Sequence, residues 1–213
     1  MKRNITISLE KAREWYNSES ALLKEMALQA FSKYELESGY TQIRTFRAAC
    51  DALELDYNVI NIYTDTIAKF SKASAAMFKV NIIRKALNLG QDLQLTKDPE
   101  NSYIYYPCNP FVTEGSTYYK SEINSGSLEI IGKIKNEGEV YDVFGGRAVN
   151  DGHVGLGVFH SHDGEGSAFA DFGFLGCANR EIAKHFGKYF GMLITEAKYG
   201  DMVDFEIIEN KYQ

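Results

Sequence analysis

Apolar residues recur every three or four positions through most of the first ninety residues. This spacing places side chains on one face of an α-helix, so the first part of the chain is predicted to be helical. The pattern predicts helices over residues 8–16, 20–36, 41–55, 65–70 and 71–89. Ser18 or Ser20 would cap the second helix. Residues 56–58 would end the third helix, and Thr64 or Asp65 would cap the fourth.

The pattern changes after Asp98-Pro99. Only Gly39 and Gly90 of the 18 glycines precede this point, and runs of β-branched and aromatic residues replace the helical spacing. Pro107 cannot donate a backbone hydrogen bond, so the first strand is predicted at a sheet edge or at the entry to a loop. Asn136-Glu-Gly138 can close a hairpin between two strands. Candidate strands cover residues 102–106, 128–134, 139–144 and 203–208.

The helical spacing returns after Asn179, a residue type that favours the N-cap position. An apolar stripe from Ile182 to Ile194 predicts a long helix that covers the sheet. The fold class is therefore α+β, with a helical N-terminal half followed by a meandering antiparallel β-sheet packed against a long C-terminal helix. Residues 1–98 would form the helical region and residues 99–213 the sheet with its helix, as two domains or as one continuous domain.

Composition narrows the classes of protein that remain. A chain of 213 residues with 45% hydrophobic residues can bury a core without disulfides or metals. Three widely spaced cysteines, Cys50, Cys108 and Cys177, fit neither a disulfide framework nor a Cys-x-x-Cys zinc site, which favours reduced thiols and a cytoplasmic location. No apolar run is long enough for a signal peptide or a membrane span, so no membrane partner is expected.

Charge is distributed unevenly along the chain. Residues 1–100 hold 14 Lys and Arg against 13 Asp and Glu, whereas residues 101–213 hold 9 against 16. Because binding to a phosphate backbone needs clustered basic side chains, this balance argues against a nucleic-acid partner. The predicted helix at 71–89 has a modestly basic face, which is either a nucleic-acid surface or simply a solvated face. Its basic residues are Lys72, Lys79, Arg84 and Lys85.

Residues that suggest chemistry are concentrated in one glycine-rich segment, residues 154–175. This segment is interpreted as a strand, a turn and a second strand. His160 and His162 lie two positions apart, so on a strand both imidazoles project from one face and can chelate one metal ion. Zinc also needs a third protein ligand, which Asp163, Glu165 or Asp171 could supply. The alternative interpretation is structural, with hydrogen-bonded histidines at a strand end followed by a hairpin turn.

The His-Ser-His sequence at 160–162 resembles the metal-binding strand of the JAMM/MPN-type zinc isopeptidases, in which a Ser and an Asp ligand follow. The resemblance implies that both histidines and Asp171 hold zinc, with Ser167 nearby. Glu139 would act as the general base. The chain would then be a metal-dependent hydrolase with a zinc cofactor.

A broader resemblance covers most of the chain. The sequence is similar to a group of uncharacterised proteins from gut Bacteroidetes and their phages or integrated mobile elements. The matching stretches are residues 8–16, 27–31, 45–53, 105–107 and 181–190. The resemblance implies an accessory or structural protein of a phage or mobile element, and it assigns no catalytic residue.

Two further features have alternative interpretations. Cys177 comes just before a predicted helix N-terminus, where a thiolate would be stabilised, and His185 could pair with it only through the fold. A group of tyrosines could form a recognition surface or cover the core. These tyrosines are Tyr103, Tyr105, Tyr106, Tyr118 and Tyr119.

The sequence therefore leads to two hypotheses of different classes. The first is a non-enzymatic interaction protein with no cofactor and an unidentified protein partner, whose oligomeric state is left open. The second is the metal-dependent hydrolase built on His160 and His162.

Overall fold

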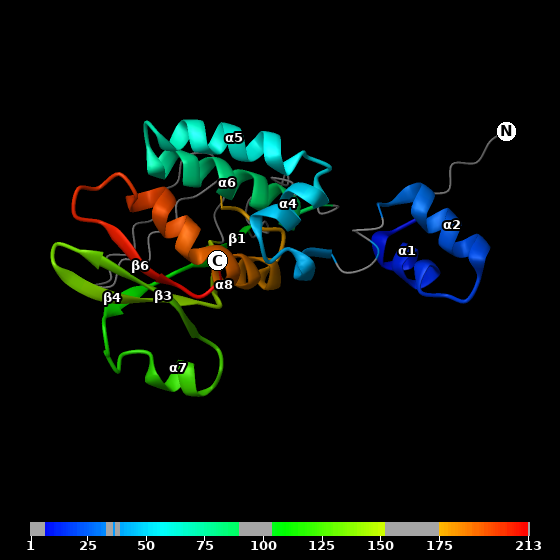
Figure 1. Cartoon of the computed structure of the whole chain (residues 1–213). Coiled ribbons are helices and arrows are strands. Elements are labelled where there is room, and N and C mark those ends of the chain that lie inside the picture. Colours follow the sequence, from blue (N-terminus) through cyan, green and yellow to red (C-terminus); the bar gives the residue numbers. More distant parts are fainter. Residues whose placement is uncertain (1–6, 33–35, 37–38, 90–103, 152–174, 213) are drawn as a thin grey trace. The chain divides into compact units, whose positions relative to one another are not determined.

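The computed structural model describes residues 7–32, 36, 39–89, 104–151 and 175–212. The chain divides into two compact units, residues 1–42 and residues 43–213, whose elements are coloured along the sequence in Figure 1. The domain boundary predicted near residue 98 falls outside the described residues and stays a prediction.

The first unit contains two helices, α1 (Leu9–Tyr16) and α2 (Ala21–Ala30). Each helix begins at a serine, because the hydroxyls of Ser8 and Ser20 accept hydrogen bonds from backbone N–H groups in the first turn. Ser20, rather than Ser18, is therefore the cap of α2. A small core joins the helices and consists of Ala12, Ala27 and Leu36.

Most α-helices of the second unit also begin at a polar side chain that caps the first turn. In the described residues the α-helices of this unit are α4 (Phe46–Ala52), α5 (Tyr57–Ala68), α6 (Lys72–Leu87), α7 (Lys120–Asn124) and α8 (Arg180–Tyr199). The 3₁₀ helix η1 (Gly39–Gln42) ends at the last residue of the first unit. Ser71 caps α6 and Asn179 caps α8, so the helices predicted at 71–89 and after Asn179 are confirmed.

The start of α5 differs from the prediction. Asp56 was expected to belong to the exit of the preceding helix, but its carboxylate accepts hydrogen bonds from the N–H groups of Asn58 and Val59 at 2.9 and 3.3 Å. These bonds make Asp56 the N-cap of α5. The helix is consequently much longer than the predicted segment at 65–70.

The strands form two antiparallel sheets. They are β1 (Ile104–Cys108), β2 (Phe111–Thr113), β3 (Glu129–Asn136), β4 (Glu139–Gly145), β5 (Arg147–Asp151) and β6 (Glu206–Asn210). β1 pairs with β5, and the larger sheet has the order β2-β4-β3-β6. Glu137 and Gly138 have φ angles of 49° and 86°, as a two-residue hairpin turn requires. The predicted β3–β4 hairpin is thus confirmed.

The long helix α8 lies at the centre of the second unit. One side of α8 packs on the strands and another side on α6, while α5 packs on the far side of α6 (Figure 1). The predicted α+β class, with the C-terminal helix on an antiparallel sheet, is confirmed. No helix of the described part of the chain is long and apolar enough to cross a membrane.

Two glycines allow α8 to approach the strands closely. Gly187 and Gly191 lie one turn apart on the buried side of α8. A Cβ atom on Gly187 would lie 2.9 Å from the Pro107 Cβ, and a Cβ on Gly191 would overlap the side chains of Asn109 and Ile131. Larger residues at these positions would push the helix away from the sheet.

The side chain of Asn109 fills the narrow space beside this helix. Its Nδ2 donates hydrogen bonds to the Phe144 carbonyl of β4 at 2.9 Å and to the Gly187 carbonyl of α8 at 2.8 Å. Because both acceptors are main-chain atoms, Asn109 links the strand and the helix without depending on other side chains. The close approach and this bridge therefore reinforce each other.

Another network connects β6 to β3 and α8. The Glu129 carboxylate accepts hydrogen bonds from Lys188 at 2.7 Å, from the Tyr212 hydroxyl at 2.7 Å and from Lys211. Burial raises the pKa of Glu129, but these three hydrogen bonds outweigh it and lower the pKa to about 2. The charged carboxylate is therefore the form that the folded protein stabilises.

Gly191→Ala is expected to destabilise the fold by about 1–3 kcal/mol, because the added methyl group must displace Asn109 or Ile131. The loss would occur although alanine is favoured over glycine inside a helix by about 1 kcal/mol. Urea denaturation would measure it. Lys184→Ala, on the solvent side of α8, should change stability by no more than about 0.5 kcal/mol. A Gly191→Ala protein as stable as the wild type would contradict the close approach.

Acid should weaken the Glu129 network in a defined pH range. The folded-state pKa of Glu129 is about 2 against an ordinary value of 4.5. Its stabilising contribution is therefore complete above about pH 4.5 and is lost as the pH falls towards 2.

The difference in unfolding free energy between the wild type and Glu129→Gln should consequently shrink across this range in urea titrations. Glu206→Gln removes the same charge from an exposed position of β6 and should not reproduce the effect. A difference that stays constant from pH 5 to pH 2 would be inconsistent with the network.

Candidate functional site

The predicted metal site lies largely outside the described residues. This applies to His160, His162, Ser167 and Asp171. Glu139 is described: it lies exposed at the start of β4, where its carboxylate accepts a hydrogen bond from the Tyr141 hydroxyl at 3.0 Å. Within the described ranges, no three His, Cys, Asp or Glu side chains are grouped so as to hold a metal ion. The zinc site stays a prediction.

The hypothesis of a reactive Cys177 is wrong. Cys177 is fully buried, and its backbone forms an isolated bridge with Tyr105 of β1. Burial raises the pKa of the thiol to about 12, against a smaller opposing effect of the Arg84 charge. The thiol is therefore protonated at neutral pH and cannot serve as an activated nucleophile.

His185 is occupied by other contacts. Its Nε2 donates a hydrogen bond to the Ile43 carbonyl at 2.7 Å, and its ring lies 4.5 Å from the ring of Tyr189. Burial lowers the pKa of His185, although the bond to Ile43 opposes this effect. These contacts assign His185 a structural role that joins the start of the second unit to α8.

The tyrosines divide between core and surface. Tyr106 is buried in β1, whereas Tyr118 is exposed. Tyr119 packs on Phe144 with a ring separation of 5.2 Å, and its ring also lies 4.8 Å from that of Tyr118. Tyr103 lies outside the described residues. The described members therefore include a core residue, Tyr106, and an exposed residue, Tyr118, and the recognition surface stays a prediction.

The basic face of α6 is partly neutralised by α8. The charges of Lys79 and Lys72 act on the half-buried Glu196, whose pKa is nevertheless raised by burial. Lys79 also lies 5.5 Å from the centre of the Phe46 ring. Lys72 and Lys79 therefore both interact with groups of the second unit, and a nucleic-acid role for this face stays a hypothesis.

The outer side of α5 carries a row of exposed apolar side chains. Thr64 is buried and Ile60 and Ile67 are half-buried, so this side of the helix faces α6. The opposite side exposes Ile62 to 66% and Phe70, just beyond the helix end, to 88%. Val59 and Tyr63 complete the row. Exposed apolar patches on a well-packed element mark interaction sites.

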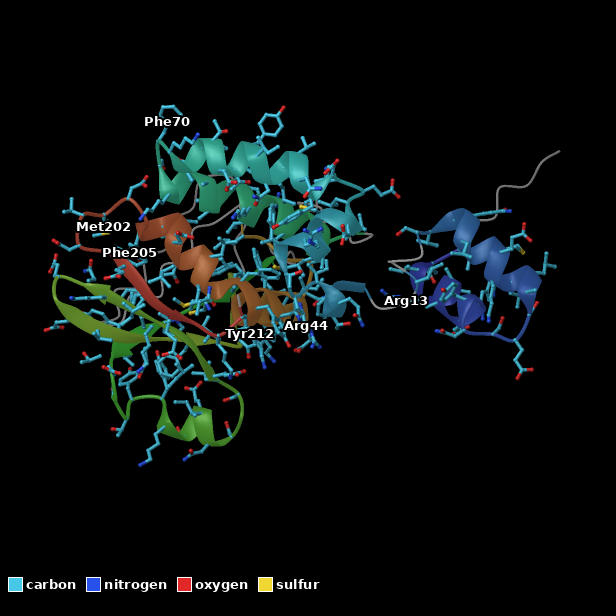
Figure 2. All side chains as sticks on the ribbon, viewed as in Figure 1. Arg13, Arg44, Phe70, Met202, Phe205 and Tyr212 are labelled. Atoms are coloured by element: carbon cyan, nitrogen blue, oxygen red, sulfur yellow. The ribbon has the colours of Figure 1, made fainter. Side chains whose placement is uncertain are left out.

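A turn from another part of the chain extends this row. Asp201 accepts hydrogen bonds from the Ser71 hydroxyl at 2.5 Å and from the Ala73 N–H at 3.2 Å, so the turn after α8 is tied to the start of α6. The next two residues, Met202 and Val203, are exposed, Val203 to 98%. Figure 2 shows Phe70 and Met202 on the same side of the second unit.

We call these six apolar residues the α5 surface. They are Val59, Ile62, Tyr63, Phe70, Met202 and Val203. Asp65 and Lys69, one turn apart, form a charged border on one flank of the helix. The arrangement has the features of a protein-binding surface, namely an apolar centre with a charged rim.

Sequence reasoning missed the α5 surface for an identifiable reason. The apolar residues of α5 occupy both its inner and its outer side, so their spacing alone does not indicate an unpartnered face. The available signal was this excess of apolar residues around the helix. Because α6 covers one apolar side of α5, the apolar residues on the other side are left exposed.

No family model matches the chain, and comparisons with curated proteins and with solved structures found no match either.

The metal hypothesis has a direct test. If His160 and His162 chelate zinc, protein purified without a histidine tag should contain roughly one equivalent of zinc, and His160→Ala with His162→Ala should remove it. Elemental analysis would measure the metal. Less than about a tenth of an equivalent of zinc, iron or manganese, even after metal is added, would refute the site.

Proposed function

We propose that this chain is a non-enzymatic interaction protein, an accessory or structural protein of a phage or bacterial mobile element that acts in the cytoplasm. We propose further that it pairs with a second copy of itself through the α5 surface. The observation that carries the proposal is the row of exposed apolar side chains on the outer side of α5. The resemblance to proteins of gut Bacteroidetes and their phages supports the biological context.

Burial of this row provides the driving force. Complete burial of an aliphatic or aromatic side chain contributes about 1.5–3 kcal/mol. Ile62, Phe70 and Val203 each expose most of their surface, so a partner would bury them at little cost in polar desolvation. The three cysteines all lie among the described residues, where they are buried and form no disulfide, as expected of a protein in a reducing compartment.

The charged border favours a second copy as the partner. In a symmetric pair, a contact made by one copy is repeated with the roles exchanged. If two α5 helices lie antiparallel, a register that places Asp65 opposite the partner's Lys69 brings the same two charges together a second time. This register also places Tyr63 close to the partner's Phe70, so the aromatic rings and the opposite charges agree on one alignment.

The same alignment uses the rest of the α5 surface. Val59 and Ile62 lie near the start of the helix and would extend past the end of the partner's α5. The turn that carries Met202 and Val203 is tied to this end through Asp201. Each copy would therefore cover the exposed turn of the other.

Charge reversal tests the register. Asp65→Lys and Lys69→Asp should each place like charges opposite one another twice per dimer and weaken the dimer about tenfold, which corresponds to about 1.4 kcal/mol. An equimolar mixture of the two variants should form a heterodimer, because every facing pair is then of opposite sign. Sedimentation equilibrium would measure the association. A mixture that associates no better than the separate variants would refute the alignment.

The contribution of the apolar residues of the α5 surface can be tested with Phe70, and Tyr118 provides a matched control. Phe70→Ser should weaken the dimer by about tenfold or more, because it removes a large apolar side chain from the interface. Tyr118→Ser changes an exposed aromatic residue away from the α5 surface and should leave association unchanged. A wild-type protein that remains monomeric at high micromolar concentration would exclude the second copy as the partner.

A further inference from the structure

A pocket of about 340 Å³ lies beside α6, on the side where the turn after α4 packs. Its lining residues are Leu53, Leu55, Phe78, Asn81, Ile82, Arg84 and Lys85. None of them belongs to the α5 surface, so any ligand of this pocket is independent of the proposed self-association. Its size is near the lower end for small-molecule sites, which are mainly apolar with a few polar groups.

The turn after α4 fixes one wall of the pocket. Glu54 has a φ angle of 55°, and the N–H groups of Leu53 and Leu55 both donate to the Cys50 carbonyl, at 3.1 and 2.9 Å. This left-handed turn closes the helix end and orients both leucines towards α6. Phe78 and Ile82, one turn apart on α6, form the opposite apolar wall.

Arg84 adds a cation with an unused donor to the pocket lining. Its Nε atom is buried and has no hydrogen-bond partner in the described part of the structure. A buried donor without an acceptor costs free energy, and an arginine fork matches a carboxylate in geometry and charge. Lys85 adds a second positive charge to the same lining.

The chemistry of the pocket is therefore amphipathic. Four apolar side chains suit a hydrocarbon body, and the two neighbouring cations suit one anionic group on it. We propose that this pocket binds a small monocarboxylate with an apolar chain, whose carboxylate accepts hydrogen bonds from Arg84. The hydrocarbon part would lie between the two leucines of the turn and the two apolar residues of α6.

Decanoate, kept below its micelle concentration, is a suitable probe for the full-length protein. Methyl NMR should show saturable shifts of Leu53, Leu55 and Ile82, and calorimetry should give the affinity. Decan-1-ol presents the same chain without the charge and should bind at least about tenfold more weakly, because it cannot make a charge-assisted hydrogen bond with Arg84.

Variants separate the role of Arg84 from a general charge effect. Arg84→Gln should weaken decanoate binding about tenfold or more while decan-1-ol binding stays the same. Lys120→Gln removes one positive charge from exposed α7 and should leave both affinities unchanged. Urea denaturation would confirm that each variant is folded. If Arg84→Gln does not fold, the wild-type preference for decanoate over decan-1-ol still decides the question.

Three outcomes would overturn the proposal. The first is no binding of decanoate at millimolar concentration. The second is binding that shifts methyl groups away from the pocket. The third is equal binding of decanoate and decan-1-ol by the wild type, because the anionic end would then contribute nothing.

Discussion

The second unit depends on how closely α8 approaches the strands. Gly187 and Gly191 remove the side chains that would separate the helix from the sheet, and Asn109 joins their backbones within the narrow space that remains. With one side of α8 fixed on the sheet, its other side is available to α6. The order of the remaining layers follows from this arrangement, since α6 then carries α5 on its outer side.

The helix α6 links the structural core to both proposed binding regions. Val80 and Ile83 are fully buried. Further residues of α6 line the pocket, and its capping residue Ser71 holds the turn that carries Met202 and Val203. The core of the second unit therefore supports the proposed binding regions mainly on helices rather than on long loops, which favours precise positioning of the contacting side chains.

Sequence reasoning succeeded where the signal was local. Ser20, Asn179 and the turn at 136–138 specify caps and a hairpin through their own chemistry, without knowledge of the rest of the fold. Asp56 was misread because an acidic residue beside a tyrosine and an asparagine suits a turn as well as an N-cap. Asn109 gave no signal at all, since its two acceptors belong to segments 35 and 78 residues away.

The candidate sites also divide into those with a local sequence signal and those that depend on the packing of distant segments. The spacing of His160 and His162 is a local pattern and could be recognised, whereas the α5 surface and the pocket arise from which helix faces are covered. The buried cysteines can also serve as probes of local opening. Cys50, Cys108 and Cys177 all belong to the described residues, where they are buried and form no disulfide, and they lie in α4, in β1 and just before α8. Because a buried thiol reacts only when its surroundings open, the labelling rate of each cysteine would report local opening at a different place in the second unit.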